Sequence, residues 1–206
     1  MDARPLHENV FCCFHFLPAT ENMSVLKTMD TRIGKYAPDF ELPGIDSQVH
    51  HLRRYLEKFR AVGVISMCNR CSYVGLYIEK LKKLQAELGK DGFTLIGVNG
   101  NIAQNDPNES FDSMKAFARE YQLNFPYLWD STQDVTRSFG ATKTPTAFLI
   151  DKDGVIRYRG QVDGNAQNQD TAEKSYLKNA VTSLFKGEEI DVTQTEALGS
   201  SLVWRN

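Results

Sequence analysis

Hydrophobic and polar positions follow two different periods in the middle of this chain, and each period predicts one kind of element. Residues 60–67 and 93–98 are apolar runs without alternation, which is typical of strands buried on both faces. Between them, apolar residues recur at three- and four-residue steps over residues 73–88, which predicts an amphipathic helix capped by Gly89. A strand, a helix and a strand in this order predict a parallel pair joined by a right-handed crossover.

Shorter patterns precede and follow this unit. Residues 36–44 predict a short extended segment and a turn, 49–52 a second short strand, and 53–59 a helical turn. After a polar loop, residues 111–121 predict a helix that Ser110 or the Asn108–Glu109 pair can cap. Residues 125–129 predict an extended piece, and 131–139 a short helix with Ser131 as its N-cap, ended by Gly140.

The last third of the chain predicts a hairpin and one more helix. Residues 146–150 and 155–160 predict two strands joined by a tight turn at 151–154. The last helix is expected to begin at Asp170 or Thr171, to run through Phe185 and to stop at Gly187. We therefore expect an α/β domain over residues 33–187. A disordered leader over 1–32 should precede it, and an irregular tail over 188–206 should pack on it.

Composition narrows the class of protein. The chain has 206 residues, of which 41% are hydrophobic and 24% charged, and this suits one domain with a sizeable core. A net charge of −2 and a pI of about 6.1 give no argument for nucleic acid or an acidic membrane surface as partners. No apolar run approaches the roughly 20 residues of a membrane span.

The cysteines bear on the compartment. Cys12, Cys13, Cys68 and Cys71 form two closely spaced pairs, which is not the disulfide framework of a small secreted fold. A reducing compartment, and hence the cytoplasm, is the expected location. The alternative is export, with the apolar patch at 10–19 as a signal-peptide core. We favour a leader without a targeting role, with Met23 as a possible start.

Two features carry candidate chemistry. Cys68 and Cys71 lie between the end of a predicted strand and the start of a helix, where the helix N-terminus and a neighbouring cation lower a thiol pKa. Arg70 lies between them and can supply that cation. Thr144-Pro145 immediately precedes a predicted strand, and a cis bond there would be a retained constraint. Two such features at strand ends predict a redox site.

With these motifs in place, the chain resembles the thioredoxin-fold redoxins of the alkyl hydroperoxide reductase/thiol-specific antioxidant family. It is most similar to the peroxiredoxin-like branch with a Cys-Asn-x-Cys motif. The resemblance implies a thioredoxin-like fold, with a central mixed sheet flanked by helices and a redoxin-type insertion over residues 101–129. The motifs that carry it are Ala37-Pro38-Asp39-Phe40, Cys68-Asn69-Arg70-Cys71-Ser72-Tyr73-Val74, Phe125-Pro126-Tyr127-Leu128, Asp130-Ser131-Thr132-Gln133, Gly140-Ala141-Thr142-Lys143-Thr144-Pro145, Tyr158-Arg159-Gly160 and Gly199-Ser200-Ser201-Leu202-Val203-Trp204.

The chain departs from the branch at several positions of the site. The branch usually has His and Pro where this chain has Arg70 and Ser72, and it often carries cysteines at the positions of Lys143 and Ser200. The absence of those cysteines removes any additional thiol relay.

Three further departures concern proton transfer and peroxide chemistry. The position of the buried carboxylate that is usual in thioredoxins is occupied by Val62, so no base there can take a proton from the second cysteine. The peroxidatic pattern needs a proline at position 61 and a threonine at position 65. This chain has Ala61 and Ile65 there, so neither residue of the pattern is present. The resemblance therefore implies the fold more strongly than peroxidase activity.

The resemblance implies a thiol-disulfide oxidoreductase with a role in redox homeostasis. Cys68 would attack and Cys71 would resolve the mixed disulfide. Asn69, Arg70 and Lys143 would support the site, and Thr144 and Pro145 would hold the substrate backbone.

No cofactor and no metal are expected. The implied partners are a protein or small-molecule disulfide and a thiol reductant, and the oligomeric state and the direction of electron flow stay open. Two alternatives are a thiol peroxidase and a non-catalytic module that binds a partner or holds a metal through the dithiol.

Overall fold

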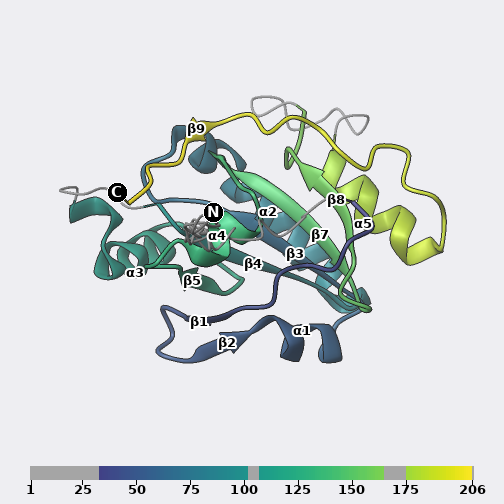
Figure 1. The fold of residues 1–206 in the computed structure, drawn as a ribbon, viewed down its shortest axis with the longest axis horizontal. Coiled ribbons are helices and arrows are strands. Elements are labelled where there is room, and N and C mark those ends of the chain that lie inside the picture. The colour runs from purple at the N-terminus through teal and green to yellow at the C-terminus, as the bar shows by residue number, and fades with distance from the viewer. Residues whose placement is uncertain (1–32, 102–106, 165–174, 206) are drawn as a thin grey trace, which may run out of the picture.

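The computed structural model describes residues 33–101, 107–164 and 175–205. At its centre is a five-stranded mixed sheet in the order β5-β4-β3-β7-β8 (Figure 1). β3 pairs in parallel with β4 and antiparallel with β7, while β5 adds in parallel to β4 and β8 antiparallel to β7. The predicted parallel pair and hairpin are thus confirmed. The strands are β3 (Ala61–Ser66), β4 (Phe93–Asn99), β5 (Tyr127–Trp129), β7 (Thr146–Asp151) and β8 (Ile156–Gly160).

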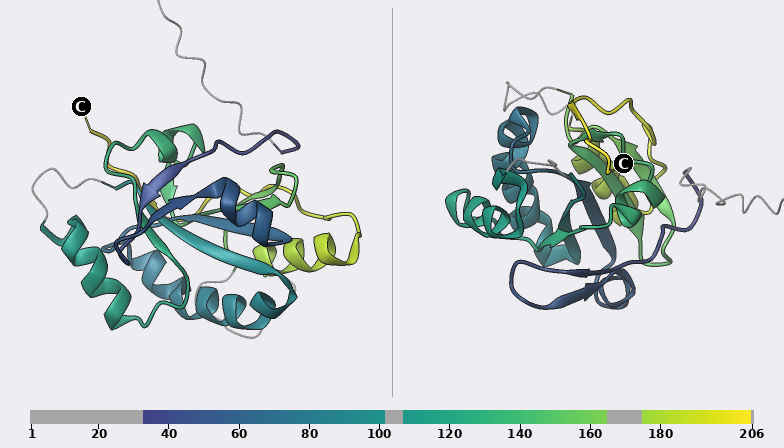
Figure 2. Two further views of the ribbon diagram at one scale, coloured as in Figure 1. Left: turned by 90° about the horizontal axis from the view of Figure 1, so that it is seen from below. Right: turned by 60° about the vertical axis from the view of Figure 1, so that its left-hand side comes forward.

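Helices cover both faces of this sheet (Figure 2). α2 (Ser72–Leu88), α3 (Phe111–Glu120) and α5 (Tyr176–Lys186) contribute apolar side chains to the core on one face. α1 (Leu52–Lys58) and the region of α4 (Asp134–Ser138) contribute to the core on the other, together with the small antiparallel sheet of β1 (Glu41–Pro43) and β2 (Val49–His51). Short 3₁₀ turns, η1 (Gly89–Asp91) and η2 (Pro107–Glu109), follow α2 and precede α3.

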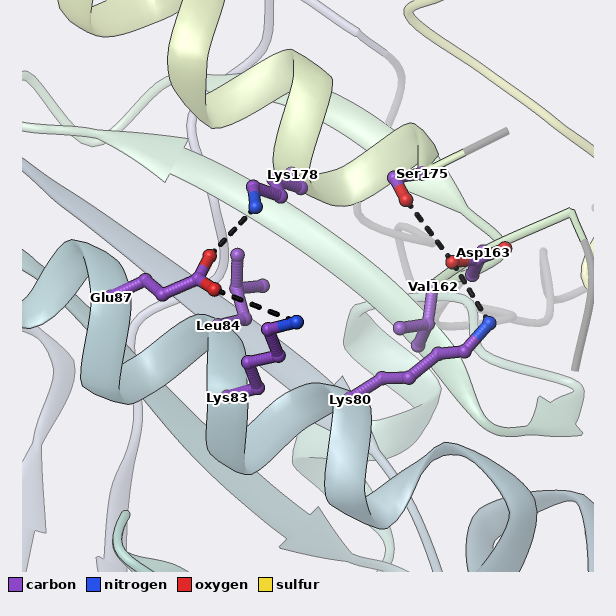
Figure 3. Close-up of a pocket in the computed structure, with 8 residues that line it drawn as sticks. All are labelled: Lys80, Lys83, Leu84, Glu87, Val162, Asp163, Ser175 and Lys178. Atoms are coloured by element: carbon purple, nitrogen blue, oxygen red, sulfur yellow. Dashed lines mark hydrogen bonds and ion pairs between the residues drawn. The ribbon is translucent and has the colours of Figure 1, made fainter. Parts of the chain in front are cut away.

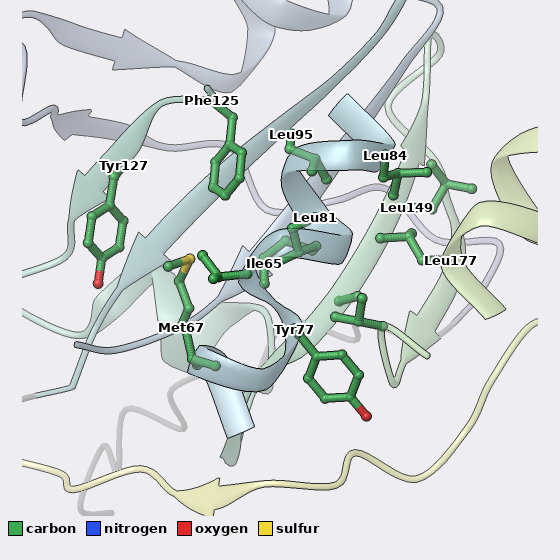
Figure 4. Close-up of a cluster of buried hydrophobic side chains, with 14 of the residues drawn as sticks. Ile65, Met67, Tyr77, Leu81, Leu84, Leu95, Phe125, Tyr127, Leu149 and Leu177 are labelled. Atoms are coloured by element: carbon green, nitrogen blue, oxygen red, sulfur yellow. The ribbon is translucent and has the colours of Figure 1, made fainter. Parts of the chain in front are cut away.

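The central strands divide their side chains between two cores because successive residues of a strand point to opposite faces. Ile65 of β3 packs in the core under α2 and α5, whereas its neighbour Val64 packs in the core under α1 and α4. Figure 4 shows the first core, where Leu81 and Leu84 of α2 face the sheet and Leu177 of α5. Burial on both faces explains why these strands read as unbroken apolar runs.

α4 is shorter than predicted and has a different cap. It begins at Asp134 instead of 131, and its N-cap is Gln133 in the left-handed conformation with φ of 67°, so Ser131 is not the cap. The preceding Asp130 is fully buried, and its Oδ2 accepts hydrogen bonds from the backbone nitrogen and the hydroxyl of Thr136, both at 2.7 Å. Asp130 thus takes the acceptor role that the sequence pattern assigned to Ser131.

The predicted cap of α3 and the predicted end of α5 are confirmed. Ser110 caps α3 by accepting from the Ser113 backbone nitrogen, and Gly187 ends α5 with φ of 71°. The described part of α5 begins at Tyr176 after Ser175, and the expected start at Asp170 or Thr171 lies outside the described residues.

A two-residue ladder in the last part of the chain was not predicted. β6 (Lys143–Thr144) pairs antiparallel with β9 (Ser200–Ser201) of the C-terminal tail. Figure 1 shows this tail crossing the molecule from α5 to β9. Two residues are too few to show a period, so hydropathy carried no signal for either strand.

Charged groups join α2 to the segment before α5 and to α5 itself (Figure 3). Lys80 pairs with Asp163 at 3.1 Å, and their side chains are 16% and 10% exposed. Lys178 pairs with Glu87 at 2.7 Å, and these side chains are 48% and 36% exposed. The first pair is the more shielded from water, so we expect it to contribute more to holding the two segments together. No helix among the described residues is long and apolar enough to cross a bilayer.

Replacing Leu81 with alanine is expected to lower the free energy of unfolding by about 2–5 kcal/mol, because the change leaves a cavity in a close-packed core. Leu81 is fully buried between α2 and the sheet. Leu76 lies on the same helix with 46% of its surface exposed, and Leu76→Ala is the matched control with a change within about 0.5 kcal/mol. Urea unfolding of both variants measures the difference, and similar losses would contradict this placement of α2.

Candidate active site

The dithiol lies at the junction of β3 and α2. Cys71 is the N-cap residue of α2 and has an extended backbone, so it lies at the positive end of the helix dipole. Cys68 precedes it in the connecting loop. Both cysteines are free thiols in this structure, and each is 5% exposed. Because β3 is central in the sheet, the loop that carries both sulfur atoms is held by a rigid strand on one side and a long helix on the other.

Thr144 contacts both sulfur atoms. Its hydroxyl oxygen lies 3.4 Å from Cys68 Sγ, and its carbonyl oxygen accepts from the Cys71 thiol at 3.0 Å. Cys71 Sγ also lies 3.4 Å from the hydroxyl of Ser200. The Thr144–Pro145 bond is cis, as hypothesised from the sequence. The fold thus brings together the two sequence features, Cys68-x-x-Cys71 and Thr144-Pro145.

The two thiols share a hydrogen bond, and this bond separates their pKa values in opposite directions. It is the largest cause that raises the pKa of Cys68, and burial is the second. The negative charge of the nearby Glu109 carboxylate raises this pKa further. The same bond is the largest cause that lowers the pKa of Cys71, to about 4, with burial opposing it and Ser200 and Thr144 supporting it. The pair therefore holds one proton at neutral pH, which the two sulfur atoms share.

Glu109 is a site residue that sequence reasoning missed. It is 6% exposed, and its carboxylate accepts from the backbone nitrogens of Asn69 at 3.2 Å and Arg70 at 3.0 Å. The side chain of Asn99 at the end of β4 donates to it as well, at 3.1 Å. Glu109 thus fixes the backbone between the two cysteines. The sequence pattern placed it only as a candidate helix cap, and no local signal shows that it reaches back to a loop 39 residues earlier.

Asn69 is held by two further hydrogen bonds. Its side-chain nitrogen donates to the carbonyl of Asn108 at 2.8 Å, and its side-chain oxygen accepts from the hydroxyl of Tyr127 at 2.9 Å. Tyr127 is fully buried on β5, in the segment predicted as a redoxin-type insertion. The insertion therefore supplies groups that position the loop of the site, in addition to extending the sheet.

The two sequence-predicted cations occupy different surroundings. The side chain of Arg70 is exposed, while its backbone is held by Glu109. Lys143 lies on β6 next to Thr144, and its amino group is 3.4 Å from the carboxylate of Glu196. Their electrostatic support of a thiolate stays a prediction. Across the part of the chain that the structure describes, no group of three or more His, Cys, Asp or Glu side chains is placed to hold a metal ion.

Replacing Glu109 with glutamine is expected to lower the pKa of Cys68, because the carboxylate charge is one of the causes that raise it. The change also weakens charge-assisted hydrogen bonds to the loop, so we expect a loss of about 1–3 kcal/mol in the free energy of unfolding. Asp112→Asn, an exposed acid in the first turn of α3, is the control. Thiolate ultraviolet absorbance against pH measures the first effect. A Cys68 titration equal to that of the control would contradict the assignment.

The sheet order, the flanking helices and a Cys-x-x-Cys pair beside a cis-proline define a thioredoxin-like protein with a dithiol site. The profile of the AhpC/TSA family matches residues 33–159. The chain belongs to this family, as its motifs indicated.

Known proteins of similar sequence and structure agree with this placement. The thiol-disulfide oxidoreductase ResA of Bacillus thuringiensis subsp. konkukian is 28% identical over 129 residues, 60% of this chain and 66% of ResA, so the chain spans about two thirds of that relative. A solved hypothetical protein from Sinorhizobium meliloti 1021 superposes with a TM-score of 0.77 and 31% identity, over 84% of this chain and 95% of the other. A putative thiol:disulfide interchange protein DsbE from Chlorobium tepidum shares the fold, with a TM-score of 0.59 and 23% identity over 75% and 98%.

Proposed function

We propose that this protein is a thiol-disulfide oxidoreductase that cycles Cys68 and Cys71 between a dithiol and a disulfide. The observation that carries the proposal is that both sulfur atoms, at the start of α2, contact the same residue. Cys68 Sγ lies 3.4 Å from the Thr144 hydroxyl, and Cys71 Sγ lies 3.0 Å from the Thr144 carbonyl oxygen. Two sulfurs in that arrangement can form a bond with each other after one of them has reacted. The name of the ResA relative as a thiol-disulfide oxidoreductase supports the same chemistry.

The proton that the two sulfurs share gives the first step. In the form of the pair that has the shared proton on Cys71, Cys68 Sγ is a thiolate, and it attacks one sulfur of the substrate disulfide. The other substrate sulfur leaves as a thiolate and takes up the proton now held by Cys71.

The second step closes the enzyme disulfide. Cys71 attacks Cys68 Sγ, the mixed disulfide breaks, and the second substrate sulfur leaves as a thiolate. The substrate disulfide has then gained two electrons, and the Cys68–Cys71 pair has lost two. A thiol reductant returns the pair to the dithiol by the same exchange. The partners are therefore a protein or small-molecule disulfide on one side and a thiol reductant on the other.

Turnover with glutathione disulfide and dithiothreitol tests this function. The wild-type protein is expected to accelerate the reduction well above the uncatalysed reaction. A Cys12→Ser/Cys13→Ser double variant serves as the control and is expected to keep the rate, because those cysteines lie outside the family match at 33–159. No acceleration by the wild-type protein would overturn the proposal. Reduction of hydrogen peroxide at a much higher rate than the disulfide would overturn it in favour of a peroxidase.

A further inference from the structure

The C-terminal strap, defined here as residues 194–205, runs past the dithiol. It leaves β8 at Thr195, whose backbone nitrogen donates to Arg159 at 3.0 Å, and it continues to Leu202, whose nitrogen donates to Thr142 at 3.0 Å. Between these points β9 pairs with β6, with Ser200 opposite Thr144. Figure 1 shows the strap along the same end of the molecule as the start of α2. The strap thus adds a strand to β6 at Thr144, the residue that contacts both sulfur atoms.

Contacts at Gly199 and Ser200 place the strap directly against the site. The hydroxyl of Ser200 is 3.4 Å from Cys71 Sγ. A Cβ at Gly199 would lie 2.0 Å from the carbonyl oxygen of Thr144 and 3.2 Å from the nitrogen of Pro145. The strap backbone is therefore in close contact with the Thr144-Pro145 peptide, and only glycine fits there. This contact leaves no room for a second chain on the same edge of β6.

An extended chain that approaches the two sulfur atoms can pair with the backbone edge of β6, because Thr144 on this strand contacts both sulfurs. A peptide that adds to a sheet edge uses the main-chain groups of that edge. A chain paired with Thr144 has its side chain at the Ser200 position next to Cys71 Sγ. An extended polypeptide that presents its disulfide to the dithiol therefore needs the edge that residues 199–201 now fill.

Few of the strap's contacts near the dithiol bury apolar side chains. Ser200 and Ser201 are exposed, and Leu202 is the buried apolar residue of this stretch. Beyond it, the carbonyl of Val203 accepts from the side chain of Gln133, and the Trp204 ring stacks with the Arg137 guanidinium at 4.4 Å. Segments with few buried apolar contacts open at low free-energy cost. Release of the strap is thus compatible with an intact sheet.

We propose that the C-terminal strap determines substrate class by occupying the β6 edge. Small disulfides reach Cys68 with the strap in place, whereas extended polypeptide disulfides are reduced only after the strap has left that edge. The inference rests on the proposed oxidoreductase function and adds a selection step to it. It assigns to Gly199 the role of a specificity-determining residue, since its missing side chain allows the strap to sit on Thr144.

The test compares kcat/KM for insulin and for glutathione disulfide, with dithiothreitol as reductant, in the full-length protein. In Gly199→Ala the added methyl group cannot fit against Thr144, so the strap leaves the edge of β6. The ratio of insulin to glutathione disulfide activity is expected to rise at least about tenfold. Leu198→Ala is the matched control, because that neighbouring side chain is 47% exposed, and its ratio is expected to equal that of the wild-type protein.

A second variant keeps the test decisive if Gly199→Ala does not fold. Arg137→Ala removes the contact with Trp204 and the hydrogen bond to the carbonyl of Arg205 at 3.3 Å, from an exposed position on α4. Its ratio is expected to rise severalfold. An unchanged ratio in a folded variant, with glutathione disulfide still reduced, overturns the strap inference alone. Failure of the wild-type protein to reduce either disulfide overturns the proposed function instead.

Discussion

A Cys71→Ser variant is expected to accumulate a covalent mixed disulfide between Cys68 and the substrate, and to lose turnover by roughly a thousandfold or more. The second step needs a thiolate placed against Cys68 Sγ, and such an intramolecular group reacts at an effective concentration far above that of a reductant in solution. Cys71, at the N-cap of α2, provides this thiolate. The first step also slows in this variant, because Cys68 loses the neighbour that accepts its proton.

Mass spectrometry after mixing with glutathione disulfide measures this effect. The Cys71→Ser protein should gain one glutathione on the peptide that contains residue 68, whereas the wild-type protein should release both glutathiones and lose two hydrogens. Cys68→Ser is the matched control, in which turnover is also lost. A stable adduct on Cys71 in that control, together with none on Cys68 in the first variant, would reverse the roles assigned to the two sulfurs.

The reduced protein is expected to contain one thiolate at about pH 6, where an ordinary cysteine with a pKa of about 8.5 is almost fully protonated. The cause is the lowered pKa of Cys71, about 4, whose thiolate receives the hydrogen bond from Cys68. Since the folded pKa is depressed, the thiolate is present above about pH 4 and is lost as the pH falls through that value. The expected excess of thiolate over an ordinary cysteine at about pH 6 is on the order of a hundredfold.

Thiolate ultraviolet absorbance of the reduced protein, taken relative to the oxidised protein, measures this titration. Cys71→Ser should remove the low-pH transition. Cys68→Ala should shift it upward, because that variant has no side-chain donor to make the hydrogen bond that lowers the pKa of Cys71 most. A single transition of the wild-type protein near the ordinary cysteine pKa would contradict the shared proton.

Much of the fold follows from local patterns in the sequence. The buried strands at 61–66 and 93–99 and the helix between them are long enough to show their periods, so their order and parallel pairing could be predicted. α4 could not be placed correctly, because its start depends on a buried Asp130 and on Gln133 in a left-handed conformation. Both depend on tertiary contacts that a window of neighbouring residues does not contain.

The candidate site was predictable where it is compact in sequence. Cys68, Cys71 and Thr144-Pro145 are recognisable because each pair or motif is contiguous or nearly so. Glu109 was not assigned to the site, and Ser200 was noted only as a position where the branch often carries a cysteine, because their contacts with the site join positions 39 and 129 residues apart. The order of the two thiol pKa values also depends on these distant groups, so helix position and a neighbouring arginine alone gave no basis for it.

The most direct test of the central claim is the redox equilibrium of the Cys68–Cys71 pair in glutathione buffers of increasing oxidation, followed by alkylation and mass spectrometry. We expect one two-electron transition in which both thiols disappear together and residues 68 and 71 become linked. A midpoint near about −270 mV would indicate a reductant, and one near about −120 mV an oxidant. Separate loss of the two thiols, or no linkage between residues 68 and 71 under oxidising conditions, would contradict the account.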